Sequence, residues 1–144
     1  MSVAIDTQVD TQVDTRVVRL QGGGLRFLEA RPLSRRDLHV VTGPSSGFDG
    51  AQHWRFIDLG GGECLIQQVS TGRFLDAARH SRVVARPRRD GDDQRWRLDD
   101  LGGGFVTIAQ VSSGRFLEAT LGGDFEVVLR PGEDNEQIWR IGEP

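Results

Sequence analysis

The chain has 144 residues, which suits one domain with a sizeable buried core. Its 18 basic residues, all arginine, are outnumbered by 21 acidic residues, and the net charge of −3 argues against a general nucleic-acid binder. The single cysteine, Cys64, cannot form an intrachain disulfide, and no apolar stretch approaches the roughly 20 residues of a membrane span.

Residue usage and the first residues give two expectations about origin and location. Lysine and tyrosine are absent and Asn135 is the single asparagine. Because these residue types share A/T-rich codons, we hypothesise a bacterial source of high G+C content. Residues 1–6 lack the basic start and apolar run of a secretory signal. We therefore expect a soluble cytoplasmic protein, while export without a leader stays open.

Residues 1–15 form an arm that precedes the repetitive part of the chain. From Ile5 onward, β-branched residues alternate with aspartate and glutamine, and this period of two is typical of a strand with one half-buried face. Two interpretations stay open. The arm is either a disordered low-complexity segment or a strand that adds to a sheet edge, with Ile5, Val9 and Val13 inward. In the second case it could support a homo-oligomer.

Three sequence motifs recur at a nearly constant spacing after the arm. Gln-x-Trp occurs at 52–54, 94–96 and 137–139, so that the tryptophans are 42 and 43 residues apart. Phe-Leu-Glu/Asp-Ala occurs at 27–30, 74–77 and 116–119, and Asp-Leu-Gly-Gly-Gly at 58–62 and 100–104. A period of this size indicates one supersecondary unit used three times. We call these the first copy (about 16–58), the second copy (59–100) and the third copy (101–144).

The second copy shows the expected elements of each copy most clearly. Residues 64–69 and 73–77 flank a Ser-Thr-Gly turn, which predicts a β-hairpin. A β-branched run at 83–87 ends in proline, which suits a strand end, and the strand that contains Trp96 follows. Each copy is therefore predicted to hold four short strands, which gives twelve, and no window shows capped helical periodicity. The first copy is longer, with its extra residues in 31–39 and 43–47.

Three four-stranded units that each close with Gln-x-Trp resemble the ricin-B-like lectin family of the β-trefoil superfamily. The resemblance covers residues 16–144 and implies an all-β fold in which six strands form a short barrel and three hairpins cap one end. It implies structural roles for the motif residues Gln52, Trp54, Gln94, Trp96, Gln137 and Trp139. Cys64 aligns with Val106, so we expect it to be a small core residue rather than a reactive thiol.

The resemblance also implies where sugars would bind. In ricin-type lectins a carboxylate at the end of the second strand accepts hydrogen bonds from sugar hydroxyls. An aromatic ring on the third strand supports the sugar, and polar groups just before Gln-x-Trp complete the site. The carboxylate position is matched by Glu29, Asp76 and Glu118, of which only Asp76 has the family's residue type. The position just before Gln-x-Trp holds Asp93 in the second copy and Glu136 in the third, with Asn135 beside it, and Arg86 and Arg130 stand where an aromatic residue is expected.

The arginines leave two interpretations of this candidate sugar site open. A guanidinium group can stack on planar groups and bind carboxylates in a bidentate manner, so Arg86 could take part in ligand binding. Alternatively, Asp76 and Arg86 simply form a surface salt bridge, which contributes little. We expect the strongest sugar site in the second copy, around Asp76, because the short carboxylate is kept there.

No pattern in the sequence indicates an enzyme. His39, His53 and His80 lie in different repeat contexts without metal-ligand spacing, and the serines cluster in turns. The glycine triplets precede strands rather than helices, so we interpret them as turns and not as phosphate-binding loops. We therefore expect no catalytic activity, no metal and no cofactor.

Two functions agree with these observations. The first is a carbohydrate-binding, lectin-like module with divergent sugar sites, and the resemblance favours it. The second is a β-trefoil scaffold that binds another protein and has lost sugar binding. The missing aromatic residues, the acidic third copy and the strand-like arm speak for the second.

Deleting residues 1–15 should leave the repetitive part of the chain folded, because none of its motifs lies in the arm. If the arm pairs as a strand, the deletion should reduce self-association or partner binding. Light scattering after size-exclusion chromatography measures the oligomer size. Fast amide exchange throughout residues 5–15, together with an unchanged oligomer size on deletion, would show that the arm is only a flexible tail.

Overall fold

The computed structural model describes residues 16–32, 37–46, 50–77, 82–132 and 135–144. These residues form twelve strands: β1 (Val17–Gln21), β2 (Phe27–Pro32), β3 (Leu38–Gly43), β4 (Trp54–Gly60), β5 (Glu63–Gln68), β6 (Phe74–Asp76), β7 (Val84–Arg86), β8 (Trp96–Gly102), β9 (Phe105–Gln110), β10 (Phe116–Ala119), β11 (Val127–Arg130) and β12 (Trp139–Gly142). Three single turns of 3-10 helix accompany them: η1 (Gly23–Leu25), η2 (Asp92–Gln94) and η3 (Asn135–Gln137). The predicted all-β fold with four strands in each copy is confirmed.

Six of the strands close into a barrel. Each pairs antiparallel with the next in the order β1, β4, β5, β8, β9, β12 and back to β1. Closure leaves these strands without an exposed edge. Within each copy the first and fourth strands pair so that a tryptophan stands opposite a small residue: Trp54 and Val18, Trp96 and Cys64, Trp139 and Val106. The predicted equivalence of Cys64 and Val106 is therefore confirmed.

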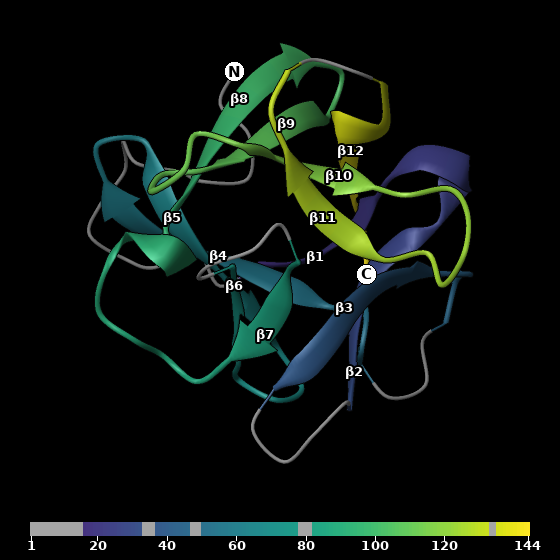
Figure 1. The fold of residues 1–144 in the computed structure, drawn as a ribbon, viewed down its shortest axis with the longest axis horizontal. Helices are drawn as coiled ribbons and strands as arrows, with labels where there is room; N and C mark the ends of the chain where they lie inside the picture. Colours follow the sequence, from purple (N-terminus) through teal and green to yellow (C-terminus); the bar gives the residue numbers. More distant parts are fainter. Residues whose placement is uncertain (1–15, 33–36, 47–49, 78–81, 133–134) are drawn as a thin grey trace.

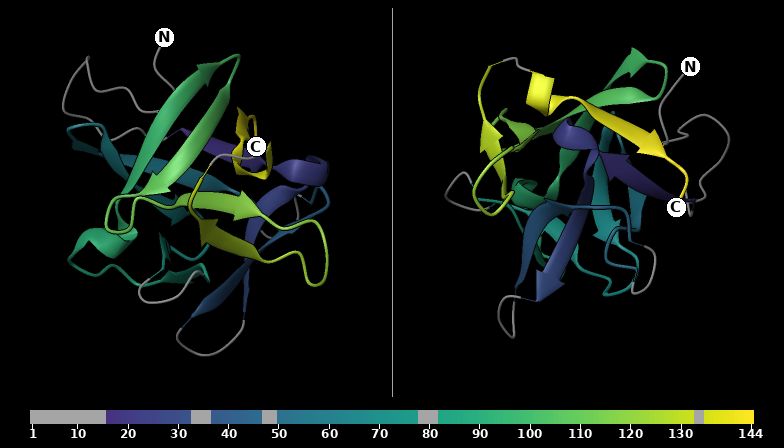
Figure 2. Two further views of the ribbon diagram at one scale, coloured as in Figure 1. Left: turned by 45° about the horizontal axis from the view of Figure 1, so that its top comes forward. Right: turned by 90° about the vertical axis from the view of Figure 1, so that its right-hand side faces the viewer.

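The other six strands form three hairpins, β2–β3, β6–β7 and β10–β11, which cap one end of the barrel. In Figure 1, β3, β7 and β11 come together around the centre of the molecule. Strand β3 pairs with β7, and isolated bridges join Val41 to Glu126 and Arg82 to Val128. The cap therefore links all three copies, as the predicted β-trefoil requires. Figure 2 shows the long β8–β9 hairpin, drawn in green, on the outside of this body.

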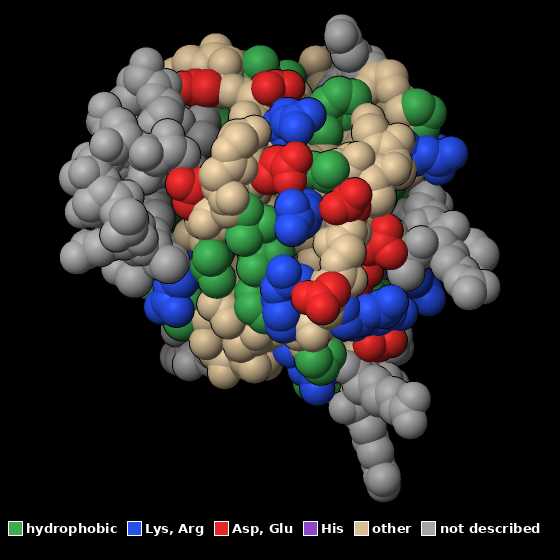
Figure 3. All heavy atoms as spheres, turned by 90° about the vertical axis from the view of Figure 1, so that its left-hand side faces the viewer, with side chains coloured by type: hydrophobic (Ala, Val, Ile, Leu, Met, Phe, Trp, Pro, Cys, Tyr) green, Lys and Arg blue, Asp and Glu red, His purple; other side chains and the backbone are tan. Residues whose placement is uncertain are grey.

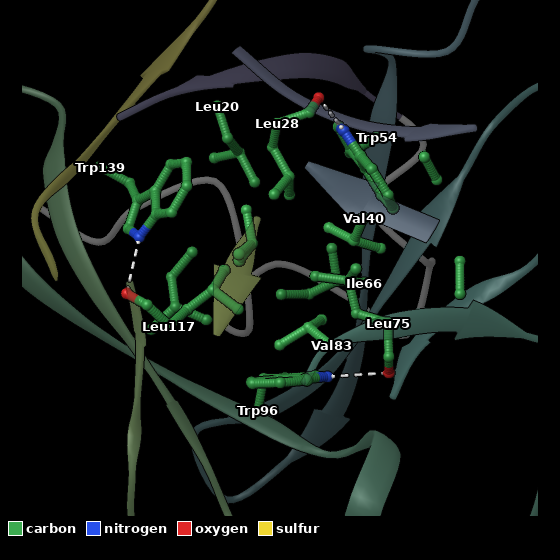
Figure 4. Close-up of a cluster of buried hydrophobic side chains, with 14 of the residues drawn as sticks. Leu20, Leu28, Val40, Trp54, Ile66, Leu75, Val83, Trp96, Leu117 and Trp139 are labelled. Carbon is green, nitrogen blue, oxygen red and sulfur yellow. Dashed lines mark hydrogen bonds between the residues drawn. The ribbon is translucent and has the colours of Figure 1, made fainter. Parts of the chain in front are cut away.

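The three tryptophans are fully buried, as predicted, with no exposed side-chain surface. Each indole N–H donates a hydrogen bond to a backbone carbonyl of the second strand in its own copy: Trp54 to Leu28 at 2.9 Å, Trp96 to Leu75 at 3.2 Å and Trp139 to Leu117 at 3.0 Å. Figure 4 shows the indoles on three sides of a cluster of leucine, isoleucine and valine side chains. Each indole thus fills the core while its one polar atom keeps a partner.

The glycine triplets are turns, as the sequence predicts. Residues 60–62 join β4 to β5 and residues 102–104 join β8 to β9, and all six glycines have positive φ angles between 65° and 92°. Side chains other than glycine rarely adopt this conformation. The aspartate that begins each motif closes the turn, because Asp58 Oδ1 accepts the Gly60 N–H and Asp100 Oδ1 accepts the Gly102 N–H.

A further buried glutamine ties each of the last two copies to its predecessor. Gln68 donates from Nε2 to the carbonyls of Ala30 and Ala51, and Gln110 donates to those of Ala77 and Asp93. The sequence motifs did not single out these glutamines. Among the described residues, no helix is long and apolar enough to span a bilayer. The arm, with Ile5, Val9 and Val13, lies outside the described residues, as does His80.

Replacing Trp96 with alanine should lower the free energy of unfolding by about 3–5 kcal/mol, because it empties a fully buried site and removes the donor to the Leu75 carbonyl. Urea denaturation followed by circular dichroism measures this change. Leu101→Ala is the control, since that side chain is 53% exposed, and its effect should stay below about 0.5 kcal/mol. Equal losses in the two variants would contradict a core role for the indole.

Candidate functional site

The three carboxylates that the sequence proposes as sugar ligands are buried. Glu29, Asp76 and Glu118 stand on the second strand of each copy, and Asp76 has no exposed surface at all. Each accepts a hydrogen bond from the Gln-x-Trp glutamine of its own copy: Gln52 Nε2 to Glu29 Oε1 at 2.7 Å, Gln94 Nε2 to Asp76 Oδ2 at 2.9 Å and Gln137 Nε2 to Glu118 Oε1 at 3.1 Å. A buried carboxylate needs such a donor, so each pair is part of the fold.

The glutamine also fixes the loop that leads from the third strand to the fourth. In the second copy, Gln94 Nε2 donates to the Pro87 carbonyl at 3.0 Å, and its Oε1 accepts the Arg89 N–H at 3.0 Å. In the first copy, Gln52 bonds in the same way with the Pro44 carbonyl and the Ser46 N–H. One side chain therefore joins the second strand, the loop and the start of the fourth strand.

An arginine approaches the second oxygen of each carboxylate, but the three approaches differ. Arg31 forms an ion pair with Glu29 Oε2 in the first copy, and Arg130 Nε lies 3.0 Å from Glu118 Oε2 in the third. In the second copy, Arg86 stays 3.9 Å from Asp76 Oδ1, measured from its terminal nitrogen. The Glu29 and Glu118 carboxylates are thus satisfied at both oxygens.

Arg86 is held by a residue of a different copy. Its Nε donates to Asp37 Oδ1 at 3.0 Å, and Asp37 lies just before β3 of the first copy. The guanidinium is about a quarter exposed, with a relative accessibility of 26%. The predicted salt bridge between Asp76 and Arg86 is present as a long ion pair of 3.9 Å, but it is not a surface pair, because Asp76 is fully buried, and the closer partner of Arg86 is Asp37.

Asp76 Oδ1 is consequently a buried carboxylate oxygen that accepts no hydrogen bond from the described residues. The aspartate is one methylene shorter than Glu29 and Glu118, which have paired arginines. Leaving a buried acceptor unpaired costs on the order of 1–3 kcal/mol. Of the three equivalent carboxylates, the one in the second copy therefore has a buried oxygen to which no described residue donates a hydrogen bond.

Two of the polar residues predicted at or beside the position before Gln-x-Trp, Asp93 and Asn135, form no described hydrogen bond with the three carboxylates. Asp93 Oδ1 accepts a hydrogen bond from the Ser112 hydroxyl at 2.9 Å, and no described hydrogen bond or ion pair joins it to Asp76 or Arg86. Asn135 is exposed at the start of η3. It lines a groove of about 540 Å³ beside the β8–β9 hairpin, together with Asp99, Leu101, Thr107, Phe116, Gln137 and Ile138.

The described residues offer little for catalysis by a metal or a thiol. Within the described ranges, no three His, Cys, Asp or Glu side chains come together as a metal site. Burial, with smaller contributions from the Asp58 and Glu63 carboxylates, raises the pKa of the Cys64 thiol far above its usual value. The thiol therefore stays protonated and unreactive.

Arginines on the second copy's outer surface are matched by nearby acids. Arg95 and Arg97 each lie 3.3 Å from a carboxylate oxygen of Glu63. Figure 3 shows acidic and basic side chains interspersed on the face that lies to the left in Figure 1. This mixture differs from the single-sign stripe that phosphate backbones favour.

Sequence reasoning missed Asp37 and the groove residues Asp99, Leu101 and Thr107. Asp37 lies in the enlarged part of the first copy, where no repeat partner exists to mark it. Asp99, Leu101 and Thr107 lie together on the β8–β9 hairpin, and the fold places them beside Asn135 and Ile138. No periodic signal in the sequence could have found either set.

Comparison with known proteins gives one family and a set of similar folds. Residues 50–129 match a family model whose description is "Ricin-type beta-trefoil lectin domain-like". No curated protein matches the chain. The designed 3-fold symmetric protein ThreeFoil is 25% identical, with a TM-score of 0.79, over 89% of this chain and 99% of that one.

Two natural proteins share the fold at lower identity. An exo-beta-1,3-galactanase from Clostridium thermocellum is 20% identical, with a TM-score of 0.79, and the match covers 90% of this chain and 30% of that one. A Polyporus squamosus lectin, whose structure holds the glycan Neu5Aca2-6Galb1-4GlcNAc, is 16% identical with a TM-score of 0.73. That match covers 92% of this chain and 50% of the lectin. At these identities the likeness establishes the fold.

Replacing Gln94 with leucine should destabilise the protein by about 2–5 kcal/mol, because Asp76 loses its donor and two backbone groups lose their partner. Thermal and urea unfolding measure the loss. Gln67→Leu is the control, since Gln67 makes a single partly buried bond to the Gly72 carbonyl and should cost about 1 kcal/mol. Equal losses in both variants would show that the buried carboxylate does not depend on Gln94.

Proposed function

Since the chain belongs to the ricin-type β-trefoil lectin domain-like family, we propose that it is a carbohydrate-binding module with its main sugar site in the second copy. Asp76 and Arg86 would form that site, and Gln94 would hold Asp76 in place. The lectin of similar fold whose structure holds a glycan supports a sugar as the ligand class. Fold alone does not decide function, so the proposal depends on the chemistry of the site.

The observation that carries the proposal is the oxygen of Asp76 without a hydrogen bond, which is buried, so that a sugar hydroxyl would reach it only when the Arg86 side chain moves aside. Asp76 Oδ1 accepts no hydrogen bond from the described residues, whereas Arg31 and Arg130 occupy the equivalent oxygens of Glu29 and Glu118. A sugar hydroxyl is a donor that suits a carboxylate oxygen, and bonds to charged acceptors are the stronger ones.

Arg86 would control access to this oxygen. Its guanidinium is partly exposed, lies 3.9 Å from Asp76 and is anchored by Asp37. A sugar that approaches beside Arg86 would donate to Asp76 and accept from the guanidinium, whose planar face can also pack against the ring. Without an aromatic ring in this position, we expect millimolar affinity for a monosaccharide, which several sites could raise.

The other predicted sugar ligands stay predictions with weaker support. Glu29 and Glu118 have both oxygens occupied, Arg130 is held by Glu118, and Asp93 is bonded to Ser112. The proposal concerns binding and not catalysis. The activity of the galactanase of similar fold belongs to that enzyme, of which this chain spans 30%.

One observation favours the alternative of a protein-binding scaffold. Leu25 is 76% exposed and adopts a positive φ of 61°, and Leu121 is 53% exposed. Leu121 of the third copy lies against the turn that contains Leu25, because a Cβ at Gly23 would lie 3.2 Å from Leu121 Cδ2. Exposed apolar side chains that gather on one face can mark a protein contact.

A glycan array with Asp76→Ala tests the proposed function. The wild-type protein should bind, and the variant should bind about tenfold or more weakly, because it loses the open acceptor. Glu29→Ala is the matched control and should keep the wild-type profile, since that carboxylate is closed by Arg31. Circular dichroism checks that both variants remain folded.

Two results would contradict this assignment in different ways. Binding that survives Asp76→Ala unchanged would place the sugar elsewhere on the protein. An array without any binding, followed by no binding of monosaccharides at millimolar concentration, would sink the carbohydrate proposal and leave the protein-binding scaffold.

A further inference from the structure

The three copies place a phenylalanine at an equivalent position but surround it differently. Phe27, Phe74 and Phe116 begin the second strands and pair with Gln21, Gln67 and Ala109 of the first strands. Two residues before these partners, on the same face of the first strand, stand Arg19, Leu65 and Thr107. These three residues are diagonal neighbours of the phenylalanines, within reach of a large side chain.

The surroundings of the phenylalanine ring differ between the copies: Phe27 is partly exposed with a cation over its ring, Phe74 is buried, and Phe116 is partly exposed. The Arg19 guanidinium lies over the Phe27 ring, 4.0 Å from its centroid. In the second copy, both Leu65 and Phe74 are buried. In the third copy, Thr107 is too short to cover the ring, and Phe116 is partly exposed and lines the groove of about 540 Å³.

A carboxylate accompanies the exposed ring in the third copy. Thr107 pairs across the β8–β9 hairpin with Asp99, which also lines the groove. The equivalent pairs are Arg19 with Gly142 in the first copy and Leu65 with Ile57 in the second. A carboxylate and a hydroxyl therefore stand side by side next to the phenylalanine in the third copy alone.

The opposite side of the groove carries fewer charged side chains than the equivalent surface of the second copy. It is formed by Asn135 and Ile138, at the η3 turn, which Figure 2 shows in yellow beside the green β8–β9 hairpin. In the second copy, Arg95 stands at the position of Ile138 and pairs with Glu63 and Asp92, at 3.3 and 3.8 Å. The third copy replaces this charged network with an uncharged side chain and one amide.

We propose that this groove is a second carbohydrate subsite, which takes one pyranose ring. Phe116 and Ile138 offer apolar surface to the C–H face of the sugar, while Asp99, Thr107 and Asn135 bond its hydroxyls. A volume of about 540 Å³ lies within the range of small-molecule sites, and this mixture of an apolar wall with a few polar groups is their usual lining. The inference rests on the proposed function but uses residues other than the second-copy site.

The sequence provides a selective probe for the groove. Asn135 is the single asparagine, so labelling with ¹⁵N-asparagine gives one backbone and one side-chain amide signal, both from the groove. The Trp96 indole N–H, bonded to the carbonyl of Leu75 next to Asp76, reports on the second copy. Nuclear magnetic resonance titrations can therefore follow the two sites separately.

The titration uses the methyl β-glycosides of galactose, glucose, mannose, N-acetylgalactosamine and N-acetylglucosamine, at concentrations up to high millimolar. At least one glycoside should shift the Asn135 signals. Galactitol, an acyclic polyol without a ring face, should not. Asp99→Asn should weaken this binding about tenfold or more, and Phe116→Leu about three- to tenfold. Asp76→Asn should leave it unchanged.

Leu101→Ser and Leu121→Ser form a matched pair, because both leucines are 53% exposed and only Leu101 lines the groove. The first should weaken binding at Asn135 and the second should not. The inference is overturned if no glycoside shifts the Asn135 signals. It is also overturned if these signals respond equally in the wild type and in Asp99→Asn. If the Trp96 indole still shifts with a glycoside in that case, the proposed function stands without the second subsite. If neither probe moves, both fail.

Discussion

A hydrogen bond from a glutamine side chain to a buried carboxylate recurs in every copy, and it determines which residues can be ligands and which must be structure. In each copy the indole donates to a leucine carbonyl, and the glutamine donates to the carboxylate of the next residue, as with Trp96 and Gln94 on Leu75 and Asp76. The glutamine stands in the turn just before the fourth strand and the tryptophan begins that strand, so the two side chains reach neighbouring residues of the second strand. The two motifs that repeat in step are therefore the two sides of one contact.

Because of this contact, each carboxylate stabilises the fold whether or not it also binds a ligand. A carboxylate taken out of water must keep its donors, so Glu29 and Glu118, each with a glutamine and an arginine, have little capacity left for a ligand. Asp76 differs by one methylene and by Asp37, which draws Arg86 aside. A small change in length thus separates a closed ion pair from an open acceptor.

The outer surface of the barrel is free of this constraint, and there the copies diverge. Inward residues of the first and fourth strands must fill the barrel, as the pairing of each tryptophan with a small residue shows. Outward residues carry no such requirement, so equivalent positions hold Arg19, Leu65 and Thr107. The same backbone therefore presents a ring beneath an arginine in the first copy, a buried ring in the second and a ring that lines a groove in the third.

The sequence by itself determined the repeat, the twelve strands, the burial of the tryptophans and the turn role of the glycine triplets. These features depend on local conformational preference and on a sequence pattern that recurs in all three copies. It also singled out Asp76 among the carboxylates, through its residue type alone.

Only the tertiary structure decided what surrounds these residues. Residues 37 and 86 are 49 positions apart and belong to different copies, so no repeat pattern connects them, yet they form the ion pair that leaves Asp76 Oδ1 open. The groove likewise combines the β8–β9 hairpin with η3, which leads into β12, the strand that pairs with β9. Contacts of this kind depend on the packing of non-equivalent side chains between copies, and one sequence carries no periodic signal for them.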